Sequence, residues 1–191
     1  MFFLNWKGGI RLIFITGGVR SGKSAFAEKY ARRLGENKLL YYVATGVSFD
    51  DEMKKRIVRH QRDRQNQNAN WDTVEMQVQI PLTIQQLSKD AVVLFECVTT
   101  WLSNVLFTYE AECKNSEYIN NCIESLQKQL LAWHQQGATI IVVSNEVLDE
   151  LPSRYNEVNL YRKLLGELHQ WIVQHSDEAY EVQYQLVQQW K

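Results

Sequence analysis

The chain has 191 residues, which at roughly 150 residues per domain predicts a single compact domain spanning residues 1–191. Lys and Arg number 21 and Asp and Glu 22, which argues against nucleic-acid or membrane partners, because such binders normally carry a basic excess. Three cysteines without CxxC spacing indicate neither a disulfide framework nor a zinc site, and with no signal-peptide pattern or membrane-length apolar run we expect a cytoplasmic protein.

Short β-branched apolar runs alternate with longer helical patterns, which is typical of an α/β protein whose mostly parallel sheet has helices on both faces. The predicted strands are residues 11–16, 38–44, 71–75, 91–96, 138–144, 178–182 and 184–190. The runs at 11–16, 38–44, 91–96 and 138–144 lack strict alternation of apolar and polar residues. A strand buried on both faces has this character, so these four strands predict the centre of a parallel sheet.

Six segments between these runs predict helices, some with signals at their ends. The predicted helices are residues 23–34, 49–66, 81–88, 99–109, 115–136 and 156–175. We expect Gly35 to end the first helix in a left-handed conformation and Pro81 to stand in a first helical turn. Ser48 with Asp51 three residues later predicts a capping box.

The first predicted strand is followed by the phosphate-binding pattern G-x-x-x-x-G-K-[ST], which opens the first predicted helix. Its residues are Gly17, Gly18, Val19, Arg20, Ser21, Gly22, Lys23 and Ser24. Glycines let the backbone wrap a phosphate chain, while amide N–H groups and the helix N-terminus supply positive potential. Lys23 reaches the β- and γ-phosphates, and Ser24 can bind Mg²⁺. The pattern predicts a nucleoside triphosphate site; the alternative is a glycine turn that merely joins strand to helix.

A magnesium site at this loop needs a carboxylate, which in such folds lies at the carboxyl end of a neighbouring buried strand. Glu96 directly follows the apolar residues of the strand predicted at 91–96. We therefore predict that Ser24 and Glu96 hold Mg²⁺. The alternative interpretation of Glu96 is a solvated carboxylate at a strand end.

Residues 51–64 are dense in charge, and helical spacing places Arg56, His60 and Arg64 on one face. Charge runs are usually solvated helix surfaces, and that is the simplest interpretation of this one. Beside a nucleotide loop, however, a histidine flanked by two arginines can act as a nucleophile toward phosphorus while the guanidinium groups neutralise developing charge.

Several motifs in a fixed order resemble one enzyme family. They are TGGVRSGKS at 16–24, YVAT at 42–45, DEM at 51–53 with Arg56, Ile57 and His60, then Trp71, Thr73 and Glu75, ECVTTWLSN at 96–104 and SNEV at 144–147. Together they resemble the bifunctional adenosylcobinamide kinase and adenosylcobinamide-phosphate guanylyltransferase of cobalamin biosynthesis. The phosphate loop alone is shared by a vast superfamily, but the ordered set is specific and spans most of the chain.

This resemblance implies a RecA-like P-loop NTPase fold, usually assembled as a homotrimer, that carries out two successive reactions. ATP or GTP first phosphorylates the aminopropanol hydroxyl of adenosylcobinamide. A histidine then takes GMP from GTP with release of pyrophosphate, and cobinamide phosphate accepts the GMP to give adenosylcobinamide-GDP. The nucleophile maps onto His60, with Lys23 as the second catalytic residue.

The resemblance also implies nucleotide contacts beyond the phosphate loop. These map onto Ala44, Thr45, Gly46, Gln61, Arg62, Asp63, Arg64, Glu75 and Glu96. After SNEV the family typically continues with a glycine-containing loop, whereas this chain has LDELP at residues 148–152. The family's usual Asn-Gln pair appears here as His169 and Gln170. Because the nucleotide motifs are intact, we interpret the altered loop as facing the corrinoid acceptor.

Two other functions compete with this one. The first is a P-loop kinase for a different small metabolite without guanylyltransferase activity, in which His60 is a surface residue or a phosphate contact. The second is a RecA-like ATP-driven motor or regulatory nucleotide-binding module. The near-zero net charge and the lack of an obvious DNA-binding loop weigh against a motor.

For the remaining histidines and for three of the tryptophans, the sequence predicts structural roles. No metal-ligand spacing relates His134, His169 and His175, so we expect them on the surface or in the core. The tryptophans at 101, 133 and 171 are interpreted as core or subunit-contact aromatics rather than as platforms for a nucleobase.

Overall fold

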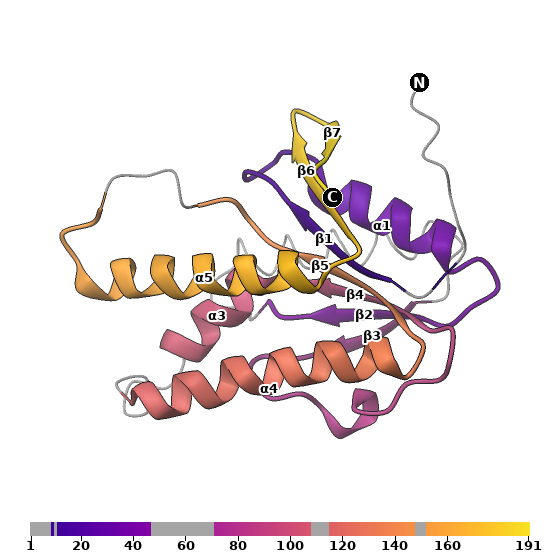
Figure 1. Cartoon of the computed structure of the whole chain (residues 1–191), viewed down its shortest axis with the longest axis horizontal. Coiled ribbons are helices and arrows are strands. Elements are labelled where there is room, and N and C mark those ends of the chain that lie inside the picture. Colours follow the sequence, from indigo (N-terminus) through magenta and orange to yellow (C-terminus); the bar gives the residue numbers. More distant parts are fainter. Residues whose placement is uncertain (1–8, 10, 47–70, 108–114, 148–151) are drawn as a thin grey trace.

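The computed structural model describes residues 9, 11–46, 71–107, 115–147 and 152–191, and these contain one seven-stranded sheet (Figure 1). The strands are β1 (Leu12–Thr16), β2 (Leu40–Ala44), β3 (Trp71–Glu75), β4 (Val92–Glu96), β5 (Thr139–Val143), β6 (Glu178–Gln183) and β7 (Leu186–Gln189). They lie in the order β3-β2-β4-β5-β1-β6-β7, and every neighbouring pair is parallel except β6 and β7. The predicted mostly parallel sheet is confirmed.

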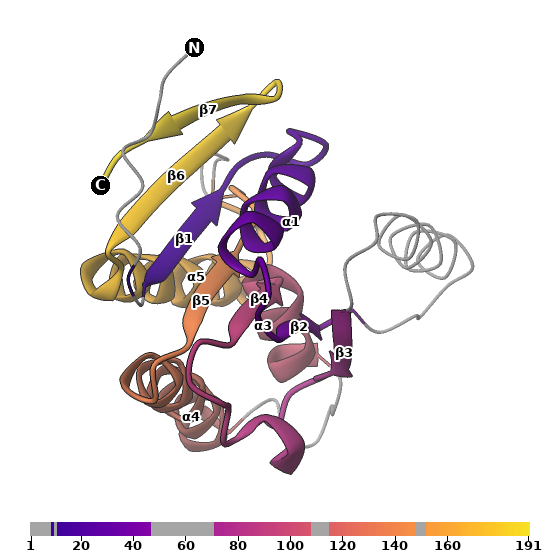
Figure 2. The same ribbon diagram turned by 90° about the vertical axis from the view of Figure 1, so that its right-hand side faces the viewer.

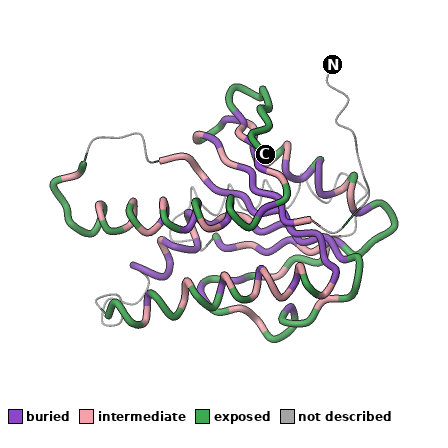
Figure 3. Tube along the Cα trace, in the orientation of Figure 1, coloured by how far each residue is buried: buried purple, intermediate pink, exposed green. Residues whose placement is uncertain are grey.

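Helices cover both faces of this sheet (Figures 1 and 2). Those of the described residues are α1 (Lys23–Leu34), α3 (Val98–Phe107), α4 (Ser116–Gln135) and α5 (Asn156–His175). Alternate residues of β1 show the division: Ile13 and Ile15 pack with α1, while Leu12 and Phe14 pack with the other three helices. Because both faces are covered, β5 is buried throughout and β1 and β4 are buried up to their last residue, and their sequences are almost continuously apolar (Figure 3).

Most predicted elements are present with small differences at their ends. The helices predicted at 23–34 and 156–175 and the strand at 71–75 have the bounds that the sequence indicated. The helix predicted at 49–66, with its capping box at Ser48 and Asp51, lies outside the described residues. No helix in the described part of the chain is both long and apolar enough to cross a membrane.

The helix predicted at 81–88 is wrong, since only a single 3₁₀ turn forms at Leu82–Ile84. Side chains of α4 and of the residue after it take backbone groups that an α-helix would use. The indole of Trp133 donates to the Ile84 carbonyl at 2.6 Å, and Gln136 Oε1 accepts the Leu87 N–H at 3.1 Å. These contacts from a distant part of the sequence compete successfully with a short local helix.

The prediction that Gly35 adopts a left-handed conformation is also wrong. Gly35 follows α1 with a φ of −96°, and the left-handed residue of this turn is Asn37, with a φ of 64°. A Cβ at position 35 would lie 2.2 Å from Leu40 Cδ2. The glycine therefore serves the close approach of the turn to β2 rather than an unusual backbone angle.

The predicted roles of the tryptophans at 101, 133 and 171 can be checked against how far these residues are buried. Trp101 is 1% exposed and Trp133 is fully buried, so both belong to the core. Trp171 is half-buried and stacks on His175 with ring centroids 4.2 Å apart.

Candidate active site at the carboxyl edge of the sheet

The carboxyl ends of the parallel strands bring several predicted site residues to one edge. Glu75, Ala44 and Glu96 stand in register on β3, β2 and β4, and Glu96 is in register with Val143 at the end of β5. The next strand is β1, which leads into the phosphate-binding pattern. With strands about 4.8 Å apart, Glu96 lies two strand spacings, about 10 Å, from the end of β1.

Residues 17–24 form a tight loop between β1 and α1. The Ser21 N–H donates to the Gly18 carbonyl at 3.2 Å, and the Phe26 N–H donates to the Gly22 carbonyl at 3.0 Å as α1 begins. Gly22 has a φ of 97° and no side chain to cap α1, and of the first N–H groups that of Lys23 reaches Ser21 Oγ only at 3.4 Å. The start of α1 therefore favours an anion from outside the protein.

Lys23 lies across this loop. Its side chain is nearly buried, with 7% of the residue exposed, and its Nζ donates to the Gly18 carbonyl at 3.2 Å. Ser24 is half-buried in the first turn of α1, while Val19 and Arg20 are exposed at the tip.

The hairpin of β6 and β7 supports the loop from behind, a contact that the sequence did not predict. The Gln185 N–H donates to the Ser21 carbonyl at 2.8 Å. A Cβ at Gly17 would lie 2.2 Å from the Val182 carbonyl oxygen, and one at Gly22 would lie 3.1 Å from Gln185 Cγ. The hairpin backbone therefore leaves no room for a Cβ at Gly17, whereas at Gly22 the left-handed φ of 97° is what favours glycine.

Glu96 is half-buried, and its carboxylate accepts a hydrogen bond from the Tyr42 hydroxyl at 3.2 Å. Tyr42 is 6% exposed on the neighbouring strand β2, so it directs the carboxylate from a fixed position. The YVAT motif contains Tyr42, but nothing in that motif indicated a contact with Glu96.

The other predicted contacts on β2 and β3 differ in exposure. Gly46 and Glu75 are exposed and Ala44 is half-buried at the edge. Thr45, in contrast, is fully buried, and its hydroxyl bonds to the backbone of Cys97. The structure therefore places the Thr45 side chain in the interior, away from the surface where a nucleotide can bind.

The SNEV segment after β5 lies between the loop and β4. Its Glu146 N–H donates to the Gly17 carbonyl at 3.0 Å, and Asn145 Nδ2 donates to Thr99 Oγ1 at 3.0 Å in the first turn of α3. The SNEV segment therefore connects the loop at 17–24 with α3, and sequence reasoning gave it no role there.

Tyr161 of α5 binds the same turn of α3. Its hydroxyl donates to the Thr99 carbonyl, and burial, with a smaller effect of Cys97, raises the pKa of Tyr161 to about 12.

His169 is buried in the core behind this segment, as the sequence allowed. Its Nε2 lies 2.7 Å from the Ser144 hydroxyl, and its ring packs 5.2 Å from that of Phe14. Burial lowers the pKa of His169 to about 4, so the imidazole is neutral at physiological pH.

Five predicted site residues lie outside the described residues: His60, Gln61, Arg62, Asp63 and Arg64. The same is true of Arg56 and of residues 148–151 in the altered loop. Among the residues that the structure does describe, no three His, Cys, Asp or Glu side chains form a group that could hold a metal ion.

Comparison with known proteins gives a match over most of the chain. A family model described as cobinamide kinase / cobinamide phosphate guanyltransferase matches residues 13–186. The bifunctional adenosylcobalamin biosynthesis protein CobU of Escherichia coli is 31% identical over 175 residues, which cover 88% of this chain and 93% of that protein. The bifunctional adenosylcobalamin biosynthesis protein CobP of Pseudomonas aeruginosa is 32% identical over 172 residues, covering 86% and 88%.

Solved structures share the fold at low sequence identity. The RadB recombinase has a TM-score of 0.51 at 15% identity, covering 91% of this chain and 74% of its own. A prototypical ATPase from the type III secretion system of pathogenic bacteria has a TM-score of 0.52 at 11% identity, covering 90% and 50%. The predicted RecA-like P-loop fold is confirmed by this likeness, which concerns the fold alone.

Proposed function

Because the chain belongs to the cobinamide kinase / cobinamide phosphate guanyltransferase family, we propose that the carboxyl edge of its sheet carries out both reactions of that family. The chain is a bifunctional enzyme of adenosylcobalamin biosynthesis that uses nucleotides and a corrinoid as substrates. The observation that carries the proposed site is the nearly buried Lys23, whose Nζ lies on the Gly18 carbonyl inside a loop between strand and helix.

In the kinase reaction, residues 17–24 hold the triphosphate of ATP or GTP. The N–H groups of the loop and the Lys23 ammonium surround the phosphates and spread the charge of the transition state. The aminopropanol hydroxyl of adenosylcobinamide attacks the γ-phosphorus and loses its proton to water. The bond from the γ-phosphorus to the bridging oxygen breaks, and the nucleoside diphosphate leaves.

Ser24 and Glu96 fit Mg²⁺ by the chemistry of their oxygens. Mg²⁺ prefers hard oxygen ligands and usually binds through one or two protein groups, substrate phosphates and water. Ser24 stands at the start of α1 and Glu96 at the same edge of the sheet, with the Tyr42 hydroxyl on its carboxylate. When bound, Mg²⁺ neutralises phosphate charge.

In the guanylyl transfer, an imidazole nitrogen of His60 attacks the α-phosphorus of GTP. A phosphoramidate forms, the bond to the β-phosphate breaks, and pyrophosphate leaves. An oxygen of cobinamide phosphate then attacks the same phosphorus and releases the histidine. Neutral imidazole is nucleophilic near pH 7, which suits this route. Ala44, Gly46 and Glu75, with residues 61–64, supply the remaining contacts to the guanine nucleotide.

Trapping the intermediate tests the histidine route. The protein is mixed with Mg²⁺ and GTP labelled at the α-phosphate and is then denatured. We expect acid-labile label on the wild type, none on His60→Ala and full label on His175→Ala, whose exposed imidazole lies at the end of α5. An unlabelled wild type contradicts the proposed route.

We also propose that the enzyme is a homotrimer, as its family resemblance implies, and that the loop at 148–152 faces the corrinoid. Light scattering on the purified enzyme tests the assembly, and a mass of one chain contradicts it. Restoring the family's glycine-containing loop tests the second point: the KM for adenosylcobinamide is expected to change while that for GTP does not.

The family match does not favour the two competing functions. A kinase for another metabolite needs no guanylyl acceptor, whereas the matched family is described by both activities. The likeness to RadB shows only a shared fold at 15% identity, so it gives no support to a motor.

A further inference from the structure

We propose that β2 and the residue after it position Glu96 through two contacts: Thr45 binds the peptide after Glu96, and Tyr42 binds its carboxylate. Thr45 is then a positioning residue rather than a nucleotide contact. This inference rests on the proposed function, in which Glu96 is the carboxylate on the metal side of the triphosphate.

Thr45 directly follows β2 and binds both polar groups of one peptide unit. Its N–H donates to the Glu96 carbonyl at 3.0 Å, and its Oγ1 accepts the Cys97 N–H at 2.7 Å. The same hydroxyl donates to the Cys97 carbonyl at 2.9 Å. Since Glu96 C=O and Cys97 N–H belong to the peptide that joins these residues, Thr45 fixes the backbone on the carboxyl side of the glutamate.

Burial leaves Thr45 no role at the surface. The residue is fully buried, and its hydroxyl has one proton, which the Cys97 carbonyl accepts. Hydrogen bonds in such a low-dielectric setting are strong and directional. The side chain is thus committed to the junction between β4 and α3.

Asn104 holds the other side of Thr45. This residue of α3 is 2% exposed, and its Nδ2 donates to the Thr45 carbonyl at 2.8 Å and to the Gln77 carbonyl at 3.0 Å. The segments that follow β2 and β3 are therefore tied to α3 as well as to β4. Thr45 cannot shift without breaking its hydrogen bonds to Asn104 and to the peptide after Glu96, so its position is fixed.

Tyr42, three residues before Thr45 and within β2, completes the positioning. Its hydroxyl donates to Glu96 Oε2 at 3.2 Å, so residues 42 and 45 together restrain the carboxylate and the backbone of Glu96. A misplacement of about 1 Å in a reacting constellation lowers the rate by about a hundredfold. Loss of the restraints on this carboxylate is therefore expected to lower kcat and to raise the Mg²⁺ requirement.

The test compares Thr45→Val, which keeps the shape and removes the hydroxyl, with Thr45→Ser, which keeps it. Kinase kcat and KM are measured with ATP and adenosylcobinamide over a range of Mg²⁺ concentrations. For Thr45→Val we expect a kcat about thirtyfold lower and a higher Mg²⁺ requirement, with the nucleotide KM within about threefold of wild type. Thr45→Ser is expected to stay within about threefold of wild type in all three values. A raised nucleotide KM with unchanged kcat indicates a nucleotide contact and overturns the inference.

A double-mutant cycle separates positioning from general structural damage. In a Glu96→Gln background, Thr45→Val is expected to cause little further loss of kcat, because its effect passes through Glu96. Losses that multiply overturn the inference. If Thr45→Val does not fold, Tyr42→Phe takes its place in the same cycle, since it removes only the hydroxyl on the Glu96 carboxylate. Wild type without kinase activity, or Glu96→Gln with full activity, contradicts the proposed function instead.

Discussion

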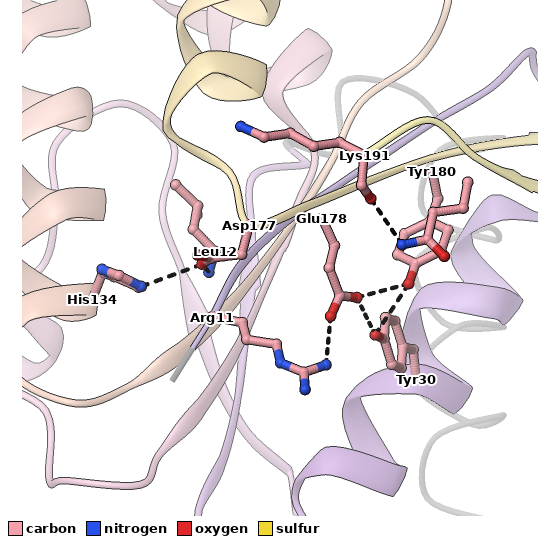
Figure 4. A network of polar contacts seen from close by, with 9 residues as sticks. Arg11, Leu12, Tyr30, His134, Asp177, Glu178, Tyr180 and Lys191 are labelled. Carbon is pink, nitrogen blue, oxygen red and sulfur yellow. Dashed lines mark hydrogen bonds and ion pairs between the residues drawn. The ribbon is translucent and has the colours of Figure 1, made fainter. Parts of the chain in front are cut away.

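The two edges of the parallel sheet use their polar side chains differently. At the amino edge, the carboxylate of Glu178 accepts hydrogen bonds from Arg11, Tyr30 and Tyr180, the last at 2.7 Å (Figure 4). At the carboxyl edge, the buried hydroxyl of Thr16 has no hydrogen-bond partner in the described part of the chain. Glu178 is thus bound by three side chains of the protein, whereas Thr16 at the other edge keeps a buried hydroxyl without a partner among the described residues.

A second carboxylate extends the paired edge. Asp177 Oδ2 accepts the Leu12 N–H at 2.8 Å and lies 3.4 Å from His134 Nε2 (Figure 4). Burial, and then the hydrogen bond to Glu178, raise the pKa of Tyr30 to about 12, so its hydroxyl remains a donor at physiological pH. This edge joins β1, β6 and α1, and we expect its variants to change stability but not nucleotide binding.

The largest difference between the edges is expected for Lys23→Ala. Removing an ammonium that binds the phosphates lowers ATP and GTP affinity by about a hundredfold, since charge-assisted hydrogen bonds contribute about 1.5–3 kcal/mol each. Titration calorimetry with non-hydrolysable analogues measures this. Lys29→Ala, at an exposed position on the same helix, is the control and binds normally. Unchanged affinity in Lys23→Ala contradicts the assignment of the loop.

Gly17→Ala tests the hairpin contact behind the loop. A Cβ there would lie 2.2 Å from the Val182 carbonyl oxygen, and the φ of 153° is itself unfavourable for alanine, so we expect a loss of about 3 kcal/mol in the free energy of unfolding. Urea unfolding measures it. At Gly18 a Cβ meets nothing within 4 Å, so Gly18→Ala is the matched control. Equal losses in the two variants rule out the hairpin as the cause.

Lowering the pH tests the contribution of His169, which is buried behind the carboxyl edge, to the free energy of unfolding. The pKa is 6.5 in the unfolded chain and about 4 in the folded protein, so the unfolded state binds the proton first. The contribution of His169 is complete above pH 6.5 and falls as the pH drops toward 4, by about 3 kcal/mol. Urea unfolding from pH 7 to 4.5 measures this loss, which His169→Asn is expected to reduce. Parallel curves for the two proteins argue against a buried neutral imidazole.

The smallest effect is expected for Tyr30→Phe at the amino edge. The change removes one of the donors to Glu178 and lowers the free energy of unfolding by about 1 kcal/mol. Affinity for GTP, measured by calorimetry, is expected to stay at the wild-type value. Weaker GTP binding in this variant would show that the two edges are not separable.

Local patterns explain which parts were predictable from sequence. The turn from β1 into α1 at residues 17–24 follows from a contiguous motif, and the position of Glu96 at the end of β4 follows from the apolar run before it. The bounds of α1 and α5 follow from helical periodicity. Each of these inferences uses residues that are neighbours in sequence.

Contacts between distant segments explain what sequence reasoning missed. Thr45 stands in the YVAT motif, whose position at the carboxyl edge is predictable, yet its burial depends on Cys97 and Asn104, more than 50 residues away. The support that Gln185 gives to Ser21 crosses most of the chain. The failed helix at 81–88 has the same origin, since Trp133 and Gln136 of a distant segment bind its backbone. No local pattern contains these pairings.

A crystal structure with Mg²⁺ and a non-hydrolysable GTP analogue tests the central claim most directly. We expect the β- and γ-phosphates within residues 17–24, with Lys23 Nζ moved from the Gly18 carbonyl onto phosphate oxygens and Glu96 on the metal side. An analogue bound elsewhere, with Lys23 still on that carbonyl, contradicts the account.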